Sequence, residues 1–134
     1  MRPRALIGIL AAIAAVAAAR RWLDVVEVRG QSMAPTLLPG DRLLVVAATP
    51  RVGDVVLALD PRQPDRELIK RVASLDATAM DLRGDNASAS TDVRVAPGAA
   101  NWRAVVRYWP PVRFGLVSRK EVPPRAATHV QPSG

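Results

Sequence analysis

The sequence contains no cysteine and a single histidine among its 134 residues. The absence of cysteine excludes disulfide bonds, thiol catalysis and cysteine-ligated metal sites. The histidine, His129, lies in a C-terminal stretch rich in proline and small residues. A Ser-His-Asp triad or a multi-histidine zinc site is therefore not expected, and we expect no metal and no cofactor.

Aromatic residues are also scarce, with three tryptophans, one tyrosine and one phenylalanine, and they do not alternate with a basic cluster. The net charge is +7, but four of the basic residues, Arg2, Arg4, Arg20 and Arg21, flank an apolar N-terminal run. The other 15 basic residues stand against 12 acidic ones. This distribution does not favour nucleic acid as a partner.

Lysine is the third scarce residue, because 17 of the 19 basic residues are arginine. The two lysines are Lys70 and Lys120. Genome base composition is the simplest cause of such a bias. Arginine keeps its proton in proteins, however, whereas a desolvated lysine can lose it. A lysine in this background is a candidate titratable amine.

The apolar run covers residues 5–19, "ALIGILAAIAAVAAA", between pairs of arginines. As a helix it would be about 22 Å long, short of a hydrocarbon core of about 30 Å. Because snorkelling arginines can extend such a span, we expect residues 1–22 to form a membrane anchor that crosses once. A cleaved signal peptide with "AAA" as its cleavage site is the main alternative, and a buried soluble helix is a third. The flanking arginines do not orient the anchor.

After residue 22 the sequence consists of short runs with β-type alternation, and no long helical period follows. The runs are "DVVEVRG", "DRLLVVAA", "GDVVLALD", "ELIKRVASL", "ATAMDLRG", "DVRVAP" and "WRAVVRYWP". Turn-forming residues separate them, for example at residues 39–41, 61–65 and 84–86. The pattern predicts a mostly antiparallel β-domain over residues 23–120 and a disordered tail over residues 121–134.

Two residues are candidates for nucleophilic chemistry, Ser32 in "GQSMAP" and Lys70 in "ELIKRV". Ser32 needs a base, and a neutral lysine can replace histidine in Ser-Lys variants of acyl transfer. Alternation places Lys70 with Leu68 and Val72 on one face of a strand, which would desolvate it. A surface lysine and an ordinary loop serine are the alternatives. In a third segment, "GDNASASTDVR", Ser88 or Ser90 can offer a hydroxyl to a neighbouring amine.

The order of these segments carries more information than any one of them. An apolar N-terminal run is followed by "GQSMAPTLLPGDRLLV", "GDVV", "IKRV" and "GDN…S.D.R". This order resembles the type I signal peptidases, a family of membrane-bound serine endopeptidases, from the N-terminal run to about residue 115. The resemblance implies the fold of that family, a coiled antiparallel β-sheet domain behind one N-terminal apolar helix.

The resemblance also implies roles for single residues. Ser32 matches the nucleophile and Lys70 the general base. Ser90 matches the serine that forms a hydrogen bond with the lysine, and Asp92 and Arg94 match a structural ion pair. No metal takes part in this chemistry.

Three residues around Ser32 match positions that shape the substrate site. Met33 and Pro35 correspond to residues that shape the substrate strand and the nucleophile turn. Gly30 stands where some family members carry a hydroxyl residue as a second oxyanion donor, so the N–H of Ser32 is the surer donor here. The resemblance implies that the partner is a precursor polypeptide with small residues one and three positions before the cut.

The compact length and the "RYWPPVRFGLV" ending resemble the small branch of nickel-type superoxide dismutase maturation proteases. That branch implies removal of the leader of a nickel superoxide dismutase precursor, at the cell membrane. The alternatives are general processing of secreted preproteins and a catalytically degenerate membrane-anchored β-domain. A self-cleaving repressor is a further alternative, although no DNA-binding helical module precedes the β-domain.

Overall fold

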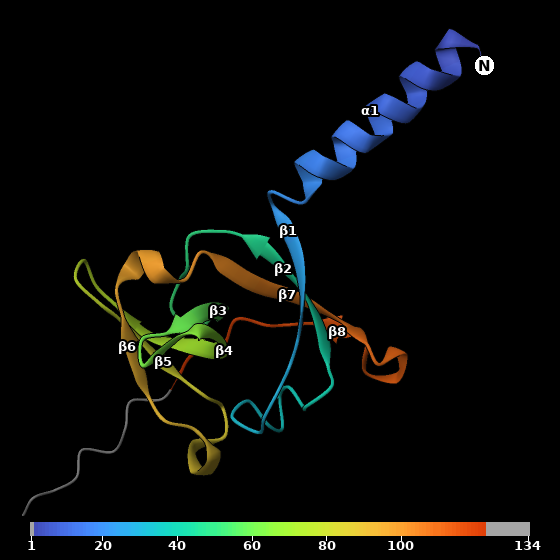
Figure 1. The fold of residues 1–134 in the computed structure, drawn as a ribbon. Coiled ribbons are helices and arrows are strands. Elements are labelled where there is room, and N and C mark those ends of the chain that lie inside the picture. Colours follow the sequence, from blue (N-terminus) through green and yellow to red (C-terminus); the bar gives the residue numbers. More distant parts are fainter. Residues whose placement is uncertain (1, 123–134) are drawn as a thin grey trace, which may run out of the picture.

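The computed structural model describes residues 2–122 of the chain. It shows one helix at the N-terminus and an antiparallel β-sheet behind it (Figure 1). The mostly β fold with a single N-terminal helix is therefore confirmed. Most of the expected tail, with His129, lies outside the described residues.

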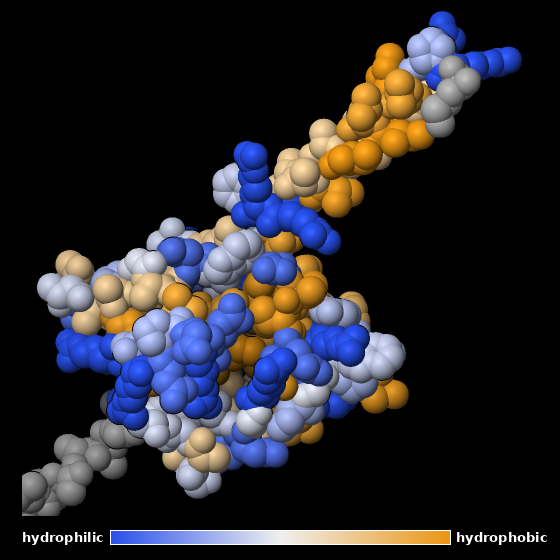
Figure 2. All heavy atoms as spheres, in the orientation of Figure 1, coloured by the Kyte–Doolittle hydropathy of each residue, from blue (hydrophilic) through white to orange (hydrophobic). Residues whose placement is uncertain are grey.

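The N-terminal helix α1 spans Pro3–Ala19. Proline at its start and the alanine-rich sequence after it both favour a helix, because the proline has no N–H to satisfy at that position. None of its residues is buried, and the helix projects away from the sheet (Figure 1). Figure 2 shows apolar side chains along most of its length and hydrophilic ones at both ends. Within residues 2–122, no helix has the length and apolar character needed to cross a membrane.

The strands follow the alternating runs of the sequence. They are β1 (Leu23–Glu27), β2 (Arg42–Ala47), β3 (Val55–Asp60), β4 (Gln63–Leu75), β5 (Met80–Arg83), β6 (Val93–Val95), β7 (Trp102–Trp109) and β8 (Gly115–Leu116). Three short 3-10 helices interrupt the loops, η1 (Ala87–Ala89), η2 (Pro97–Ala99) and η3 (Pro111–Arg113).

All strand pairs are antiparallel, in the order β1-β2-β7-β3-β4-β5-β6, and β8 pairs with β7. Two clusters of buried side chains form the core. One holds Met33 and Leu37 of the loop before β2 together with residues of β2, β3 and β7, and the other lies over β3, β4, β5 and β6. Strand β4 contributes to both clusters through Ile69 and Val72, so both of its faces are covered near residue 70.

The hairpin between β3 and β4 differs from the prediction. Residues 61–65 were expected to form a turn, but the turn is shorter and β4 already begins at Gln63. The Asp60 side chain closes the turn by accepting a 2.9 Å hydrogen bond from the N–H of Arg62. Pro64 is tolerated because β5 pairs with β4 only from Arg71 onward, so the missing N–H disrupts no ladder on that side. The result is a long hairpin arm that extends beyond the rest of the sheet.

Candidate active site

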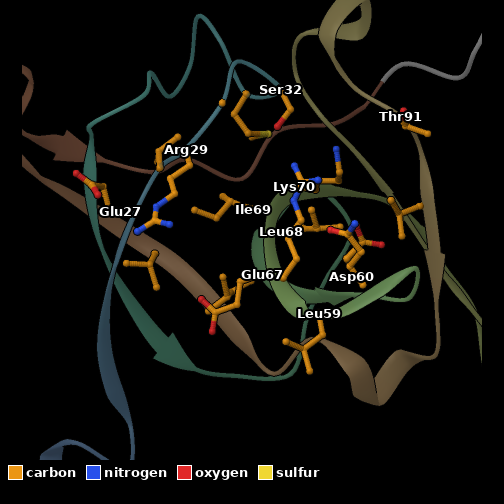
Figure 3. A pocket seen from close by; sticks show the side chains of 18 of the residues that line it. Glu27, Arg29, Ser32, Leu59, Asp60, Glu67, Leu68, Ile69, Lys70 and Thr91 are labelled. Carbon is orange, nitrogen blue, oxygen red and sulfur yellow. The ribbon is translucent and has the colours of Figure 1, made fainter.

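A groove of about 1040 Å³ runs between two parts of the chain that are far apart in sequence. One wall comes from residues 25–30, which are the end of β1 and the segment after it, together with Ser32 and Met33. The other wall comes from the β3–β4 hairpin arm, up to Lys70. Figure 3 shows Ser32 and Lys70 close together at one end of this groove, whereas Glu27 and Glu67 lie farther away.

Lys70 is buried, with 5% of its surface exposed. Its position on β4 lies opposite Val56 of β3, which is also buried. Its Nζ donates a 2.8 Å hydrogen bond to Ser90 Oγ. A lysine is seldom buried this far without a directly bonded acidic partner. Burial at this position therefore favours the neutral amine over the protonated one.

The pKa of Lys70 is lowered from its ordinary value of 10.5, and burial of the amine is the largest cause. The negative charges of Asp92 and Asp60 raise the pKa of Lys70, whereas the positive charge of Arg66 lowers it further. Burial dominates because a charged amine loses the solvation that water provides. The folded chain therefore favours the neutral, basic form of Lys70.

Gly84 brings the Ser32 loop against Ser90. A Cβ at Gly84 would overlap the carbonyl oxygen of Ser32 and the side chain of Ser90. The N–H of Gly84 also donates a 3.0 Å hydrogen bond to Ser90 Oγ. Glycine is required here by close packing, and this packing holds Ser32 beside the partner of Lys70.

Asn86 fastens the same loop from the other side. Its backbone N–H donates to the carbonyl of Ser32 at 2.9 Å, and its side-chain Nδ2 donates to the carbonyl of Gln31 at 3.0 Å. Ser88 donates to Oδ1 of Asn86 at 2.8 Å, so of the two candidate hydroxyls Ser90 takes the amine. Neither Gly84 nor Asn86 was assigned a role from the sequence, although both lie in the "GDN" motif.

Asp92 and Arg94 do not pair with each other as expected. Asp92 forms an ion pair with Arg83 at 3.3 Å, and Arg94 forms one with Asp81 at 3.8 Å. The reason is the sheet register, in which Arg94 lies directly opposite Asp81. Directly opposed side chains lie closer together than residues two apart on one strand. The expected Asp92–Arg94 ion pair is therefore wrong, and both residues instead join β6 to β5.

One buried ion pair beside the site was not predicted from the sequence. Arg71 Nε and Nη2 each donate a 2.8 Å hydrogen bond to a carboxylate oxygen of Asp85. Burial raises the pKa of Asp85, but the hydrogen bonds from Arg71 and Thr36 outweigh it, and the pKa is lowered below 3.8. Arg71 follows Lys70 and Asp85 follows Gly84, so this pair holds the two motifs together. Their places in "KRV" and "GDN" were the available signal.

The three residues expected to shape the substrate site lie in different places. Gly30 and Met33 line the groove, and Met33 is buried in the core. Pro35 is exposed and borders a separate hollow of about 470 Å³ instead. Gly30 has φ +76°, with open space around its Cα. A positive φ favours glycine, which explains why no hydroxyl residue stands there.

The nucleophile candidate also offers a backbone donor beside its hydroxyl. Within residues 2–122, the backbone N–H of Ser32 donates to no protein acceptor. The same part of the chain contains no cluster of three histidine, cysteine or acidic side chains that could hold a metal ion. The chemistry on offer is thus a serine hydroxyl, a basic amine and a free amide donor.

Comparison with known proteins agrees with this arrangement. Residues 2–87, which are more than half of the chain, match the family model "Signal peptidase, peptidase S26". The chain belongs to the signal peptidase family. It is also similar to the mitochondrial ATP-independent inner membrane protease subunit 1a of Arabidopsis thaliana, with 32% identity. That match covers 72% of this chain and 76% of the relative. No solved structure matches the chain significantly.

Membership in the signal peptidase family confirms the resemblance at family level and makes the chain a type I signal-peptidase-like protein. The relative is named as an inner membrane protease subunit, which agrees with a signal-peptidase-like protease. The matched residues include Ser32 and Lys70 and end at Ala87. Ser90 lies beyond the matched residues, and its hydrogen bond with Lys70 places it at the site.

Proposed function

We propose that the chain is a serine endopeptidase in which Ser32 is the nucleophile and Lys70 the general base. One observation carries the proposal: a buried lysine, held by Ser90 at 2.8 Å, lies in the same groove as Ser32, and residues 2–122 contain no histidine that could act as the base instead. The lowered pKa of Lys70 supports it, since a base has to be uncharged to accept a proton.

The proposed reaction has two steps. Neutral Lys70 accepts the proton of Ser32, and the oxygen of Ser32 attacks the scissile carbonyl. Lys70 then passes this proton to the amine of the substrate's leaving group as the peptide bond breaks. Water activated by Lys70 then hydrolyses the acyl-enzyme. The free N–H of Ser32 is positioned to stabilise the oxyanion. Ser90 orients the amine, because its hydroxyl accepts one hydrogen bond from Nζ and another from the N–H of Gly84.

The substrate is proposed to bind as an extended strand in the groove. β1 is the last strand at one end of the sheet, and β4 has no β5 partner before Arg71. Both strands therefore offer unpaired backbone groups along the groove walls, which an added peptide strand can use. Small residues before the cut, as the family implies, would fit beside the buried Met33 wall.

The proposal is tested with a precursor protein and three variants. Ser32→Ala and Lys70→Met should each abolish cleavage, and N-terminal sequencing of the product from the wild type should give the cut site. Ser74→Ala is the matched control, because Ser74 is exposed on β4 and bonds only to Asp81. Retained cleavage in either of the first two variants would show that the dyad is wrong.

The pH profile gives a second test. Because Lys70 acts only when neutral, the rate should fall as the pH drops through its lowered pKa and should rise towards alkaline pH. A rate that stays flat between about pH 5 and 9 contradicts Lys70 as the base.

We further propose that the cleaved segment is the leader of a nickel superoxide dismutase precursor. The support is the compact length and the "RYWPPVRFGLV" ending, which resemble the small maturation branch. General processing of secreted preproteins is the competing function. Incubation of the purified chain with each precursor in parallel separates them, since a dedicated protease should cleave the superoxide dismutase precursor and leave the secretory one intact.

The exposed apolar helix α1 is proposed to attach the chain to a membrane. All of its described residues are accessible and most are apolar, and the named relative is an inner membrane protease subunit. The precursor would then be cleaved near the membrane surface.

A further inference from the structure

A short C-terminal segment, residues 117–120, crosses the sheet and contacts the start of β3. We name it the strap. The N–H of Val117 donates to the carbonyl of Val105 at 2.9 Å, and the N–H of Lys120 donates to the carbonyl of Gly53 at 3.0 Å. Arg119 Nε donates to Asp54 Oδ1 at 2.8 Å. The strap is therefore fixed at both ends and by one ion pair.

Gly53 allows the strap to lie this close. Its φ is +90°, and a Cβ added there would lie 2.7 Å from the carbonyl oxygen of Lys120 and 2.8 Å from Cγ of Arg119. Both the backbone conformation and the packing thus require glycine. The contact is built into the fold and does not depend on Arg119 alone.

The strap also contacts the neighbour of the proposed base. Arg71 Nη1 donates to the carbonyl of Ser118 at 3.0 Å and to the carbonyl of Gly53 at 2.8 Å. The other nitrogens of the same guanidinium hold Asp85. Arg71 therefore links the strap to the loop that carries Gly84 and Ser90.

We propose that the strap, with Arg119 as its anchor, is a positioning element for Lys70 and Ser90. The inference rests on the proposed function of Ser32 and Lys70. The strap contacts Arg71, and Arg71 in turn binds Asp85. Gly84, next to Asp85, donates a hydrogen bond to Ser90, which also accepts one from the amine of Lys70. Without the strap, Arg71 loses one of its two carbonyl acceptors, and the loop that carries Ser90 is held less firmly.

Arg119 forms the ion pair of the strap, so its loss weakens the attachment of the strap although the backbone hydrogen bonds remain. Asp54 is buried, with 3% of its surface exposed, and its Oδ1 takes the bond from Arg119. The other oxygen accepts a 2.9 Å hydrogen bond from the N–H of Arg51. Removal of Arg119 leaves a buried carboxylate without its cation, an arrangement that strongly favours rearrangement or hydration.

The test compares Arg119→Gln with Arg51→Gln in the full chain. Arg51 is the matched control, since its side chain is exposed and its printed contacts with Asp54 come from the backbone: its N–H donates to the Asp54 carboxylate at 2.9 Å and its carbonyl accepts from the N–H of Asp54 at 3.0 Å. The first readout is kcat on an internally quenched peptide with alanine one and three positions before the cut. Arg119→Gln should lower kcat about 10-fold with KM nearly unchanged, Arg51→Gln should have no effect, and Arg119→Lys should restore part of the rate.

The second readout reports on Lys70 directly. The chain has only two lysines, so trace acetylation at a series of pH values, read by mass spectrometry, compares Lys70 with the exposed Lys120. The charged groups around Lys70 are Asp60 on β3, Arg66 on β4 and Asp92 before β6, and Arg119→Gln changes none of them. If the strap keeps Lys70 buried, Arg119→Gln should let water reach the amine and raise the pKa of Lys70 towards its ordinary value. Acetylation of Lys70 in this variant should then require a higher pH.

The outcomes separate the two proposals. Unchanged kcat and unchanged Lys70 acetylation in Arg119→Gln overturn the inference. A lower melting temperature with unchanged acetylation also overturns it, because the strap is then merely structural. If Ser32→Ala still cleaves, the proposed function fails, whereas the acetylation profile still decides whether the strap positions Lys70.

Discussion

Lys70 meets two opposing demands at the scale of a single residue. The proposed base must be uncharged to accept a proton, and burial favours the uncharged form by lowering the pKa of Lys70. The same burial destabilises the fold whenever the amine is protonated. Between the lowered pKa and 10.5 the unfolded chain binds more protons than the folded one, so stability rises with pH across that window.

Lys70→Met should therefore abolish cleavage and at the same time stabilise the protein. At pH 7 we expect the free energy of unfolding to increase by about 1–2 kcal/mol. The gain should shrink as the pH rises towards 10.5, because a growing fraction of the amine is then neutral in the unfolded chain as well. Urea unfolding at pH 7 and at pH 10 measures both values. A variant that is less stable than the wild type at pH 7 contradicts this account of the site.

Gly84 tests whether the two motifs have to be in contact. Gly84→Ala should reduce stability by about 1–3 kcal/mol and should also reduce cleavage, because the added Cβ overlaps Ser32 and Ser90. Gly98→Ala is the control, since nothing lies within 4 Å of a Cβ at that position. Thermal unfolding and peptide cleavage of both variants measure the effect, and equal behaviour of the two would disprove the close contact.

Gly30 tests the role of a positive φ next to the nucleophile. Gly30→Ser should lower stability by about 1–2 kcal/mol and should slow cleavage by shifting the backbone beside Ser32. Gly40→Ser has a matching strain, with φ +90° and open space, but lies outside the groove. We expect similar melting temperatures for the two variants and a slower kcat for Gly30→Ser alone. A faster rate would mean that the new hydroxyl serves as an oxyanion donor.

At the scale of elements, alternation in the sequence predicted strands β1 to β7, whereas the two-residue strand β8 was not predicted. The runs around Leu43, Val56 and Val72 became β2, β3 and β4, because each has apolar residues on the buried side. The β3–β4 turn was predicted too long, since Pro64 suggested a break that an unpaired strand edge does not require. Local signals describe single strands well and their ends less well.

Contacts between elements were harder to predict than the elements. Asp92 and Arg94 are neighbours in sequence, but each found its partner across the sheet on β5. The Arg71–Asp85 pair joins residues 14 apart, and no local pattern marks them as partners. Sheet register decides such pairs, and register follows from the whole fold. The family motifs named the segments that meet, and the structure supplied the contacts.

The Arg71–Asp85 pair should hold β4 to the "GDN" loop. Arg71→Met leaves a carboxylate that is 16% exposed without its partner, so we expect a loss of about 3 kcal/mol. Arg94→Met, which breaks an exposed pair at 3.8 Å, should lose less than about 1 kcal/mol. Denaturant unfolding of both variants at pH 7 measures the difference, and equal losses would mean that Arg71 is not the stronger link.

The same pair predicts acid sensitivity. The pKa of Asp85 is lowered below 3.8 in the folded state, so its contribution is present above pH 3.8 and is lost as the pH falls through the lowered value. In Arg71→Met this part of the acid dependence should disappear. Circular dichroism between about pH 2 and 7 records both curves.

At the scale of the whole molecule, the helix and the sheet have separate proposed roles. The sheet holds the candidate site, whereas α1 extends away from it with its apolar side chains exposed (Figure 2). Basic residues lie at both ends of the helix, and positive charge favours anionic lipid headgroups. The proposed membrane attachment and the proposed cleavage can therefore be tested independently.

A double substitution, Leu10→Asp with Ile13→Asp, should release the protein from anionic vesicles. Both side chains are exposed on α1, and two charges there oppose insertion. Val112→Asp is the control, because Val112 is 92% exposed on η3, away from the helix. In a vesicle flotation assay, the wild type and the control should float with the lipid. The double variant should stay in the unbound fraction, and its flotation with the lipid would exclude α1 as the attachment site. Peptide cleavage in detergent should be equal in all three.

The long hairpin arm has a consequence for the protein when it is not bound to substrate. An empty groove leaves unpaired strand edges on β1 and on the early part of β4, and such edges promote pairing between copies. Charged side chains cover the arm at Arg62, Asp65, Arg66 and Glu67. Like the charges on natural edge strands, they discourage the assembly of identical molecules into an aggregate. The residues that border the groove thus oppose self-association of the protein between one round of the proposed cleavage and the next.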